Sequence, residues 1–180
     1  MLNRIMGVIT LKAPVYKEIA EDKSATTSAA IIVVVMAFFS AIVGAIILVA
    51  VSGMLPPEQV AAAGSPIGSA VKTIINQIVG WLVGSWVIAF VAKTFFGGKT
   101  DTGEMLRVFG FTQVFGIFNI VPCIGTIAAL ILSLIGAVIG IREAAEFDTT
   151  KAILTAIVAF IALMIVSAII GTILALVGLV

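Results

Sequence analysis

Five long apolar runs limit what this chain can fold into more than any other feature of its sequence. They cover residues 29–51, 73–92, 105–121, 124–141 and 152–180. An α-helix needs about 20 apolar residues to cross roughly 30 Å of hydrocarbon, and each run has that length or nearly so. The pattern predicts an all-α, polytopic membrane protein with five transmembrane helices. We expect residues 29–180 to form this domain and residues 1–28 to form an amphipathic lead at its cytoplasmic side.

The composition excludes several classes of protein. Hydrophobic residues make up 62% of the chain and charged residues 11%, which leaves too little polar surface to coat a soluble fold. The net charge is only +1, so we expect no nucleic-acid partner. The chain has no histidine, which removes Ser/His and Cys/His catalysis and histidine metal sites. We expect a non-enzymatic protein without cofactor or metal, whose first partner is the lipid bilayer.

The lead carries two short amphipathic patterns. Leu2, Ile5 and Ile9 recur at helical spacing, and a second apolar face follows Pro14, a residue well suited to the first turn of a helix. The pattern predicts two short helices that lie on the membrane surface or against the bundle.

The distribution of Lys and Arg orients the bundle. Four precede the first run, and none lies in the first loop apart from Lys72 at the edge of the second run. Three lie in or beside the second loop, none lies at the third, and two lie in the fourth. Cytoplasmic loops carry the excess of positive charge in membrane proteins. We therefore expect a cytoplasmic N-terminus and a C-terminus on the outside.

The third and fourth runs are expected to form a tight hairpin that turns at Pro122 and Gly125. The third run has at most 17 residues, which barely cross a bilayer at about 1.5 Å per residue. A re-entrant hairpin that enters from the cytoplasmic side is the alternative, because buried non-spanning segments are tolerated inside a bundle.

Two glycine pairs have the small-xxx-small spacing of close helix contacts. Gly80 and Gly84 lie in the second run, and Gly136 and Gly140 lie in the fourth. Without large side chains, helix backbones approach each other closely. We expect helix packing within one chain at these glycines, with a homo-oligomer as the alternative.

Charged residues of the second and fourth loops are the candidates for binding a partner protein. Lipid-facing helices offer only apolar contacts, whereas loop charges give specificity. The candidates are Lys99, Asp101, Glu104, Arg107, Arg142 and Glu143. Arg107 also has a structural interpretation, because it can pair with Glu104 one turn away. The first prediction of function is an adaptor or scaffold that organises membrane or cytoplasmic proteins through these loops.

Four amide side chains within or beside the second and third runs support a different function. They are Asn76, Gln77, Gln113 and Asn119. Amides inside a bundle commonly form hydrogen bonds between helices. They also line the polar paths of small permeases and channels, which is the alternative function.

Four segments of the sequence resemble a known family. They are residues 13–22, the stretch at 96–111, the turn at 120–125 and the link at 140–153. In this order between apolar runs, they resemble a prokaryotic member of the Yip (Ypt/Rab-interacting protein) domain family, over about residues 10–180. The resemblance implies five transmembrane helices, a cytoplasmic N-terminus, no catalytic residues and a place in a prokaryotic cytoplasmic membrane.

The resemblance implies less about partners. Eukaryotic members of the family act as adaptors for Rab-type GTPases. This chain has a much shorter cytoplasmic lead, and the acidic-aromatic motif of those members is not found in it. Rab binding is therefore not carried over to this chain.

Overall fold

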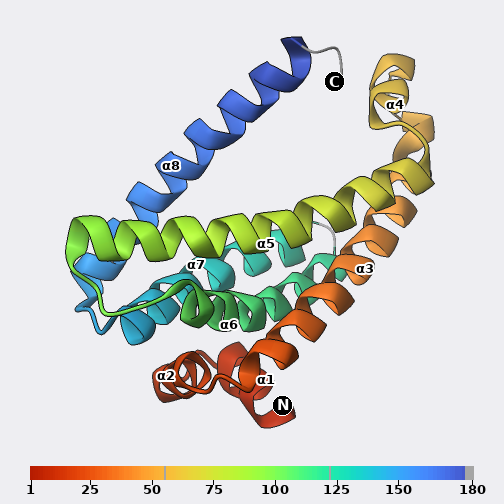
Figure 1. Ribbon diagram of the computed structural model, residues 1–180. Coiled ribbons are helices and arrows are strands. Elements are labelled where there is room, and N and C mark those ends of the chain that lie inside the picture. Colours follow the sequence, from red (N-terminus) through yellow and green to blue (C-terminus); the bar gives the residue numbers. More distant parts are fainter. Residues whose placement is uncertain (55, 122, 177–180) are drawn as a thin grey trace.

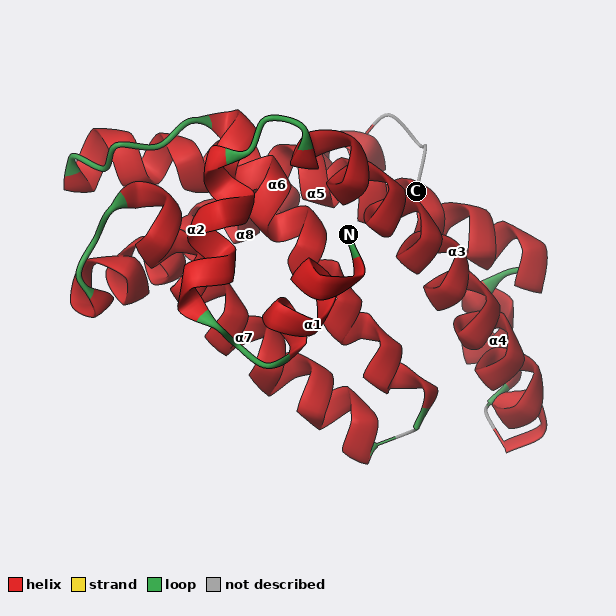
Figure 2. Ribbon diagram, turned by 90° about the horizontal axis from the view of Figure 1, so that it is seen from below, coloured by secondary structure: helices red, strands yellow, loops and turns green. Residues whose placement is uncertain are grey.

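The computed structural model describes residues 1–54, 56–121 and 123–176, and all regular structure in these ranges is helical (Figure 1, Figure 2). The lead forms α1 (Leu2–Ile9) and α2 (Ala13–Glu21). The elements after it are α3 (Ala25–Val51), η1 (Ser52–Met54), α4 (Pro57–Ala63), α5 (Pro66–Phe96), α6 (Thr102–Thr112), η2 (Gln113–Ile120), α7 (Ile124–Ala145) and α8 (Thr149–Leu176). The prediction of an all-α fold is confirmed.

Four helical segments are long and apolar enough to cross a membrane. They are Ala25–Met54, Pro66–Phe96, Ile124–Ala145 and Thr149–Ile169. Large apolar side chains cover their exposed faces, among them Phe38, Leu134 and Phe160. A bilayer solvates such a surface, whereas water does not. The chain is a multi-pass membrane protein.

The third apolar run differs from the single helix that was predicted for residues 105–121. It begins within α6 and then tightens into the 3₁₀ helix η2. At the junction, the Thr112 hydroxyl donates to the Phe109 carbonyl oxygen at 2.9 Å. Gly116 and Asn119 follow, and both residue types are poor α-helix formers. These residues favour a change of helix type over a continuous α-helix.

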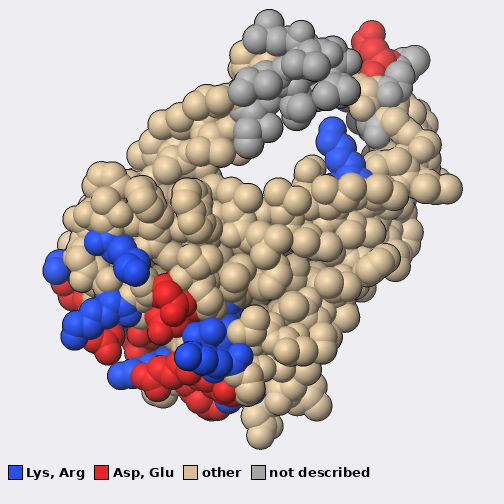
Figure 3. All heavy atoms as spheres, viewed as in Figure 1, with Lys and Arg blue, Asp and Glu red and all other residues tan. Residues whose placement is uncertain are grey.

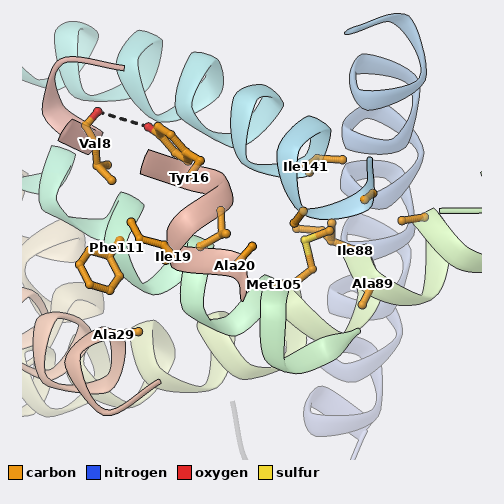
Figure 4. Packing of buried hydrophobic residues seen from close by; sticks show 14 of the residues in the cluster. Val8, Tyr16, Ile19, Ala20, Ala29, Ile88, Ala89, Met105, Phe111 and Ile141 are labelled. Atoms are coloured by element: carbon orange, nitrogen blue, oxygen red, sulfur yellow. Dashed lines mark hydrogen bonds between the residues drawn. The ribbon is translucent and has the colours of Figure 1, made fainter. Parts of the chain in front are cut away.

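The amphipathic lead packs against the bundle. Its buried side chains Val8, Tyr16 and Ile19 join one hydrophobic cluster with residues of α3, α5, α6, α7 and α8 (Figure 4). The Tyr16 hydroxyl donates to the Val8 carbonyl oxygen at 3.3 Å, which satisfies the polar tip of a fully buried ring. The lead is thus part of the packed core at one end of the bundle.

Capping residues fix the helix ends on the side of the lead. α5 ends at Gly97, whose φ of 68° is left-handed and suits a residue without Cβ. α6 begins with a capping box, in which the Glu104 N–H donates to Asp101 Oδ1 at 2.8 Å and the Asp101 N–H donates to the Glu104 carboxylate at 3.3 Å. α7 ends at Glu146, also left-handed with a φ of 54°. These caps set the conformation of the loops after α5 and α7.

α8 packs on the bundle only through its first half. Ala152, Thr155 and Ala159 are buried, whereas all side chains at residues 164–169 are exposed. Figure 1 shows α8 leaving the other helices as it runs toward the C-terminus. Residues 164–169 of α8 therefore do not belong to the packed core.

Candidate functional site

The charged side chains gather at one end of the molecule. Figure 3 shows Lys, Arg, Asp and Glu together over one corner, beside a long uncharged surface. Every Lys and Arg except Lys72, and every Asp and Glu except Glu58, lies within residues 1–28, 93–107 or 142–151. We call these three segments the charged end.

Direct contacts join two loops of the charged end that are far apart in sequence. Lys99 Nζ lies 3.2 Å from Glu146 Oε2, and the Lys99 backbone N–H donates to the Ala145 carbonyl oxygen at 3.2 Å. The rings of Phe96 and Phe147 meet edge to face, with centroids 6.4 Å apart. The loops after α5 and α7 thus form one continuous surface.

The predicted partner-binding residues differ in their contacts within the chain and in the exposure of their side chains. Asp101 and Glu104 hold each other in the capping box of α6. Arg142 donates two hydrogen bonds, of 2.9 and 2.8 Å, to one carboxylate oxygen of its neighbour Glu143. The side chain of Lys99 is 82% exposed in spite of its ion pair. Lys99 is therefore more accessible than Arg142 and Glu143, whose side chains are 32% and 20% exposed.

Arg107 differs from the prediction, because its side chain is buried and not available to a partner. Its Nε donates to the Ala20 carbonyl oxygen at 2.9 Å, Nη2 donates to the same oxygen, and Nη1 lies 3.5 Å from the Thr26 hydroxyl. Ala20 belongs to the last turn of α2, where carbonyl groups lack helical partners and the helix dipole favours a cation. Arg107 caps α2 from α6, and it does not form the expected pair with Glu104.

A second charged cluster ties α1 and α2 to the start of α3. The guanidinium of Arg4 lies 2.8 Å from a carboxylate oxygen of Glu18 and 2.8 Å from one of Asp22. Hydrogen bonds from Ser24 and Arg4 lower the pKa of the Asp22 carboxyl to about 2. The hydrogen bonds of Arg4 to Asp22 and Glu18 raise the pKa of the Arg4 guanidinium. Both groups therefore stay charged at neutral pH.

A polar cavity of about 540 Å³ lies between α3, α5, η2 and α7. The amides of Gln77, Gln113 and Asn119 line it. Hydroxyl groups complete its polar lining, and they belong to Ser40, Thr112, Thr126 and Ser133. A cavity of this volume falls within the range of ligand pockets. Three of the four amides that the sequence singled out therefore meet at one cavity.

One of the four predicted amides does not line the polar cavity. Gln77 Nε2 donates to Gln113 Oε1 at 3.3 Å, which is the expected type of hydrogen bond between helices. Asn76 is exposed and does not line the cavity. Successive residues of a helix point about 100° apart, so Asn76 and Gln77 face different surroundings.

Gly136 and Gly140 lie where α7 comes close to neighbouring side chains. A Cβ atom at Gly136 would lie 2.8 Å from the ring of Phe115 and 3.0 Å from the Tyr16 hydroxyl oxygen. A Cβ atom at Gly140 would lie 2.4 Å from a methyl group of Val108. Only glycine leaves room for these contacts. They allow Val108 of α6 and Tyr16 of the lead to pack closely against α7.

Gly80 and Gly84 differ from the predicted packing role. A Cβ atom at either position would meet no atom of the described chain within 4 Å. The buried residues of α5 all lie between Ser85 and Ala92, nearer the charged end. The helix therefore has open space beside it where the two glycines occur.

The predicted turn is described only in part, because Pro122 lies outside the described residues. A Cβ atom at Gly125 would lie 1.9 Å from the Phe118 carbonyl oxygen, so any larger residue there would displace η2 from α7. Cys123 precedes α7, is exposed and has a φ of 65°. The close approach at Gly125 lets η2 and α7 lie beside each other directly after the turn.

Sequence reasoning missed a second contact of small residues, between α5 and α8. α5 contributes Ser85, Ala89 and Ala92, and α8 contributes Ala152, Thr155 and Ala159, all buried. The spacing of three, four and seven residues is the signal that marks such contacts. Alanine is too common in this chain for that spacing to stand out. The Ser85 and Thr155 hydroxyls have no hydrogen-bond partner among the described residues.

Comparison with known proteins gives one clear result. The family model of the Yip1 domain matches residues 6–171. No curated protein and no solved structure matches the chain. The match extends from α1 through α8, and so includes the docked lead, the charged end and the polar cavity. The chain belongs to the Yip1 domain family of membrane proteins.

Proposed function

We propose that this Yip1 family protein is a non-enzymatic membrane adaptor that recruits other proteins through its charged end. The contact between Lys99 and Glu146 carries the proposal, because it joins the loops after α5 and α7 into one exposed surface. Charges held in place by their neighbours select partners by complementarity. The apolar helices anchor this surface at the membrane.

We infer five membrane crossings with the charged end in the cytoplasm. α6 has 11 residues and η2 has 8. At about 1.5 Å and about 2.0 Å per residue, these elements together reach about 32 Å, which matches the hydrocarbon thickness. α6 with η2 then forms a spanning hairpin with α7. The concentration of Lys and Arg at the charged end supports its cytoplasmic side.

We also infer a location in a prokaryotic cytoplasmic membrane, on the resemblance of the chain to prokaryotic family members. The two helices of the lead pack against the bundle through Val8, Tyr16 and Ile19.

The alternative function is a small permease or channel, and the polar cavity favours it. A path across the membrane needs polar groups along its whole length. Toward the charged end from the cavity, α6 contributes Met105 and Val108 and α7 contributes Ile141, which are apolar and fully buried. This apolar layer closes the path in the present conformation, so the adaptor is the better-supported function.

Photo-crosslinking in native membranes tests the adaptor function. A benzoylphenylalanine residue replaces Thr150, which is exposed at the charged end. We expect an adduct of defined mass with a second protein. The charge swap Lys99→Glu with Glu146→Lys keeps an ion pair but reverses the charge pattern, and it should abolish the adduct.

Two controls accompany this experiment. The same photoreactive residue at Ile161, exposed on α8, should label lipid without a protein adduct. Gln113→Leu changes the polar cavity alone and should leave the adduct intact. An adduct that survives the charge swap would overturn the adaptor function, and so would its loss in Gln113→Leu together with a measurable solute flux.

A further inference from the structure

A second cavity, of about 580 Å³, adjoins the polar cavity. It lies between α5, α7 and α8, and all of its lining side chains are apolar. We call it the apolar cleft. Phe109, Leu130, Leu134 and Ala137 border both cavities. The two cavities therefore lie next to each other along α7, one with a polar lining and the other with an apolar lining.

The positions of the lining residues along α7 set the direction of the two cavities. Thr126, in the first turn of α7, lines the polar cavity, and Ile141, near the charged end, lines the apolar cleft. Between these residues the helix rises about 22 Å, at about 1.5 Å per residue. The polar cavity thus begins at the end of the bundle remote from the charged end and reaches Ala137, in the second half of α7. The apolar cleft overlaps it from Leu130 and continues to Ile141, nearer the charged end.

The apolar cleft is accessible from the side of the helices that faces lipid. Leu134, Ile157 and Phe160 line it and are 59%, 50% and 63% exposed. Figure 1 shows α8 diverging from the other helices toward the C-terminus, beyond the residues that line the cleft. A hydrocarbon chain in the bilayer therefore has a direct way in.

We propose that the adjoining cavities bind one neutral glycerolipid from the bilayer. Its glycerol and ester groups lie against Gln77, Gln113 and Asn119, and one acyl chain lies in the apolar cleft.

The chemistry of the lining selects this class of ligand. Amide and hydroxyl groups both donate and accept hydrogen bonds, which suits glycerol hydroxyl and ester groups. The described lining residues include no Lys or Arg, so a phosphate group would lose its hydration without gaining a counter-charge. A small polar solute alone would leave the apolar cleft unfilled and its walls without van der Waals partners. An uncharged head with an acyl chain satisfies both cavities.

Photoaffinity labelling with a defined lipid tests the proposal. The purified protein is reconstituted in phosphatidylcholine nanodiscs that contain a trace of diacylglycerol with a diazirine in its acyl chain. We expect labelled peptides from residues 130–141 and 153–163. Unlabelled diacylglycerol should compete with the probe, whereas phosphatidylglycerol should not.

Two variants and a matched control separate the site from general lipid contact. Ala137→Phe fills the junction between the two cavities and should remove most of the labelling. Gln113→Leu removes one polar partner and should lower labelling about fivefold, the effect of losing one net hydrogen bond. Ala168→Phe makes the same change as the first variant at an exposed position of α8 outside both cavities, and should label like the unaltered protein.

The labelling of each variant is compared only after the variant is shown to be folded. A thermal unfolding curve for each variant shows that it is folded, and Gln113→Leu serves if Ala137→Phe does not fold. Labelling that is equal in Gln113→Leu and Ala168→Phe would overturn the proposal, as would equal competition by phosphatidylglycerol. Crosslinks between the α7 and α8 helices of two copies would show that the cleft is a protein interface and would also overturn it.

Discussion

At the scale of single residues, Arg107 connects two parts of the fold through one side chain. Its bonds to the Ala20 carbonyl complete the end of α2, and its charge opposes the negative end of that helix dipole. Arg107→Met keeps much of the side-chain volume but leaves this carbonyl without its donor. We expect the free energy of unfolding to fall by about 1–3 kcal/mol, measured by denaturant unfolding in detergent.

The matched control for this substitution is Lys99→Met, which removes a cation from an exposed position of the same end. Surface ion pairs contribute little to stability. The unfolding curve of Lys99→Met should therefore coincide with that of the unaltered protein. An equally small effect for Arg107→Met would contradict the capping role.

Tyr16 is the single tyrosine of the chain and reports on the docking of the lead. Burial raises the pKa of its hydroxyl well above the ordinary value of 10.0. A raised folded-state pKa stabilises the fold below the unfolded-state pKa, and this contribution is lost as the pH rises above it. We expect stability to decline above about pH 10, and we expect Tyr16→Phe, which cannot ionise, to reduce that decline.

Ultraviolet absorbance of the tyrosinate measures the ionisation of the Tyr16 hydroxyl directly. In the folded protein at about pH 11, the signal should stay low and appear only on unfolding. A full tyrosinate signal from folded protein would mean that α2 leaves the bundle or is never docked on it. Asp22 provides a comparison within the lead, because its pKa is lowered and its contribution is lost in acid instead.

At the scale of helices, two glycines of similar sequence context have opposite surroundings. A Cβ atom at Gly140 would lie 2.4 Å from Val108, whereas one at Gly80 would meet nothing within 4 Å. We expect Gly140→Ala to lower the free energy of unfolding by about 1–3 kcal/mol through overpacking. Gly80→Ala should raise it by up to about 1 kcal/mol, because alanine favours the helix.

Thermal unfolding of both variants in the same detergent checks this pair. Each substitution adds one methyl group to a long apolar helix, so differences in detergent binding are small. Similar shifts in the two variants would show that α7 has more room at Gly140 than the distances indicate.

The sequence was sufficient to predict four long apolar helices, because apolar length is a local property. It predicted the positions of α3, α5, α7 and α8 to within several residues. The change from α6 to η2 was not predictable from hydrophobicity, since it depends on hydrogen bonding and propensity around Thr112. Gly140 and Gly80 belong to the same small-xxx-small motif in the sequence. They differ only in the neighbouring side chains, because Val108 lies beside Gly140 and no described residue lies beside Gly80.

The residue types of the candidate sites could be predicted from the sequence, but their orientation and contacts could not. Counting amides in apolar runs found Gln77, Gln113 and Asn119, but only the rotation of α5 decides that Asn76 faces elsewhere. The burial of Arg107 could not be predicted from its neighbours, because its partner carbonyl lies in the lead. The apolar cleft left no mark in the sequence, since residues that line it resemble residues that face lipid.

At the scale of the whole molecule, five crossings give the two ends of the bundle different accessibility. The exposed thiol of Cys123 would then lie on the side opposite the charged end. We expect a membrane-impermeant maleimide to label Cys123 in intact cells. A variant with Cys123→Ser and Lys99→Cys should be labelled only after the inner face is opened.

The reverse pattern of labelling would invert the orientation of the bundle. Labelling of both thiols from the inner face only would instead support a re-entrant hairpin of α6, η2 and α7. In that case only α3, α5 and α8 would cross the membrane.

The bond between Arg107 and Ala20 has a consequence for the order of events during synthesis. The two residues are 87 positions apart. A ribosome adds about 5–20 residues per second, so about 4–17 s pass between the synthesis of α2 and that of its cap. Through this interval the lead has no bundle to dock on, and an amphipathic helix then rests on the membrane surface. The first segment to be made is thus among the last to reach its final position, and the arrival of α6 draws it off the lipid.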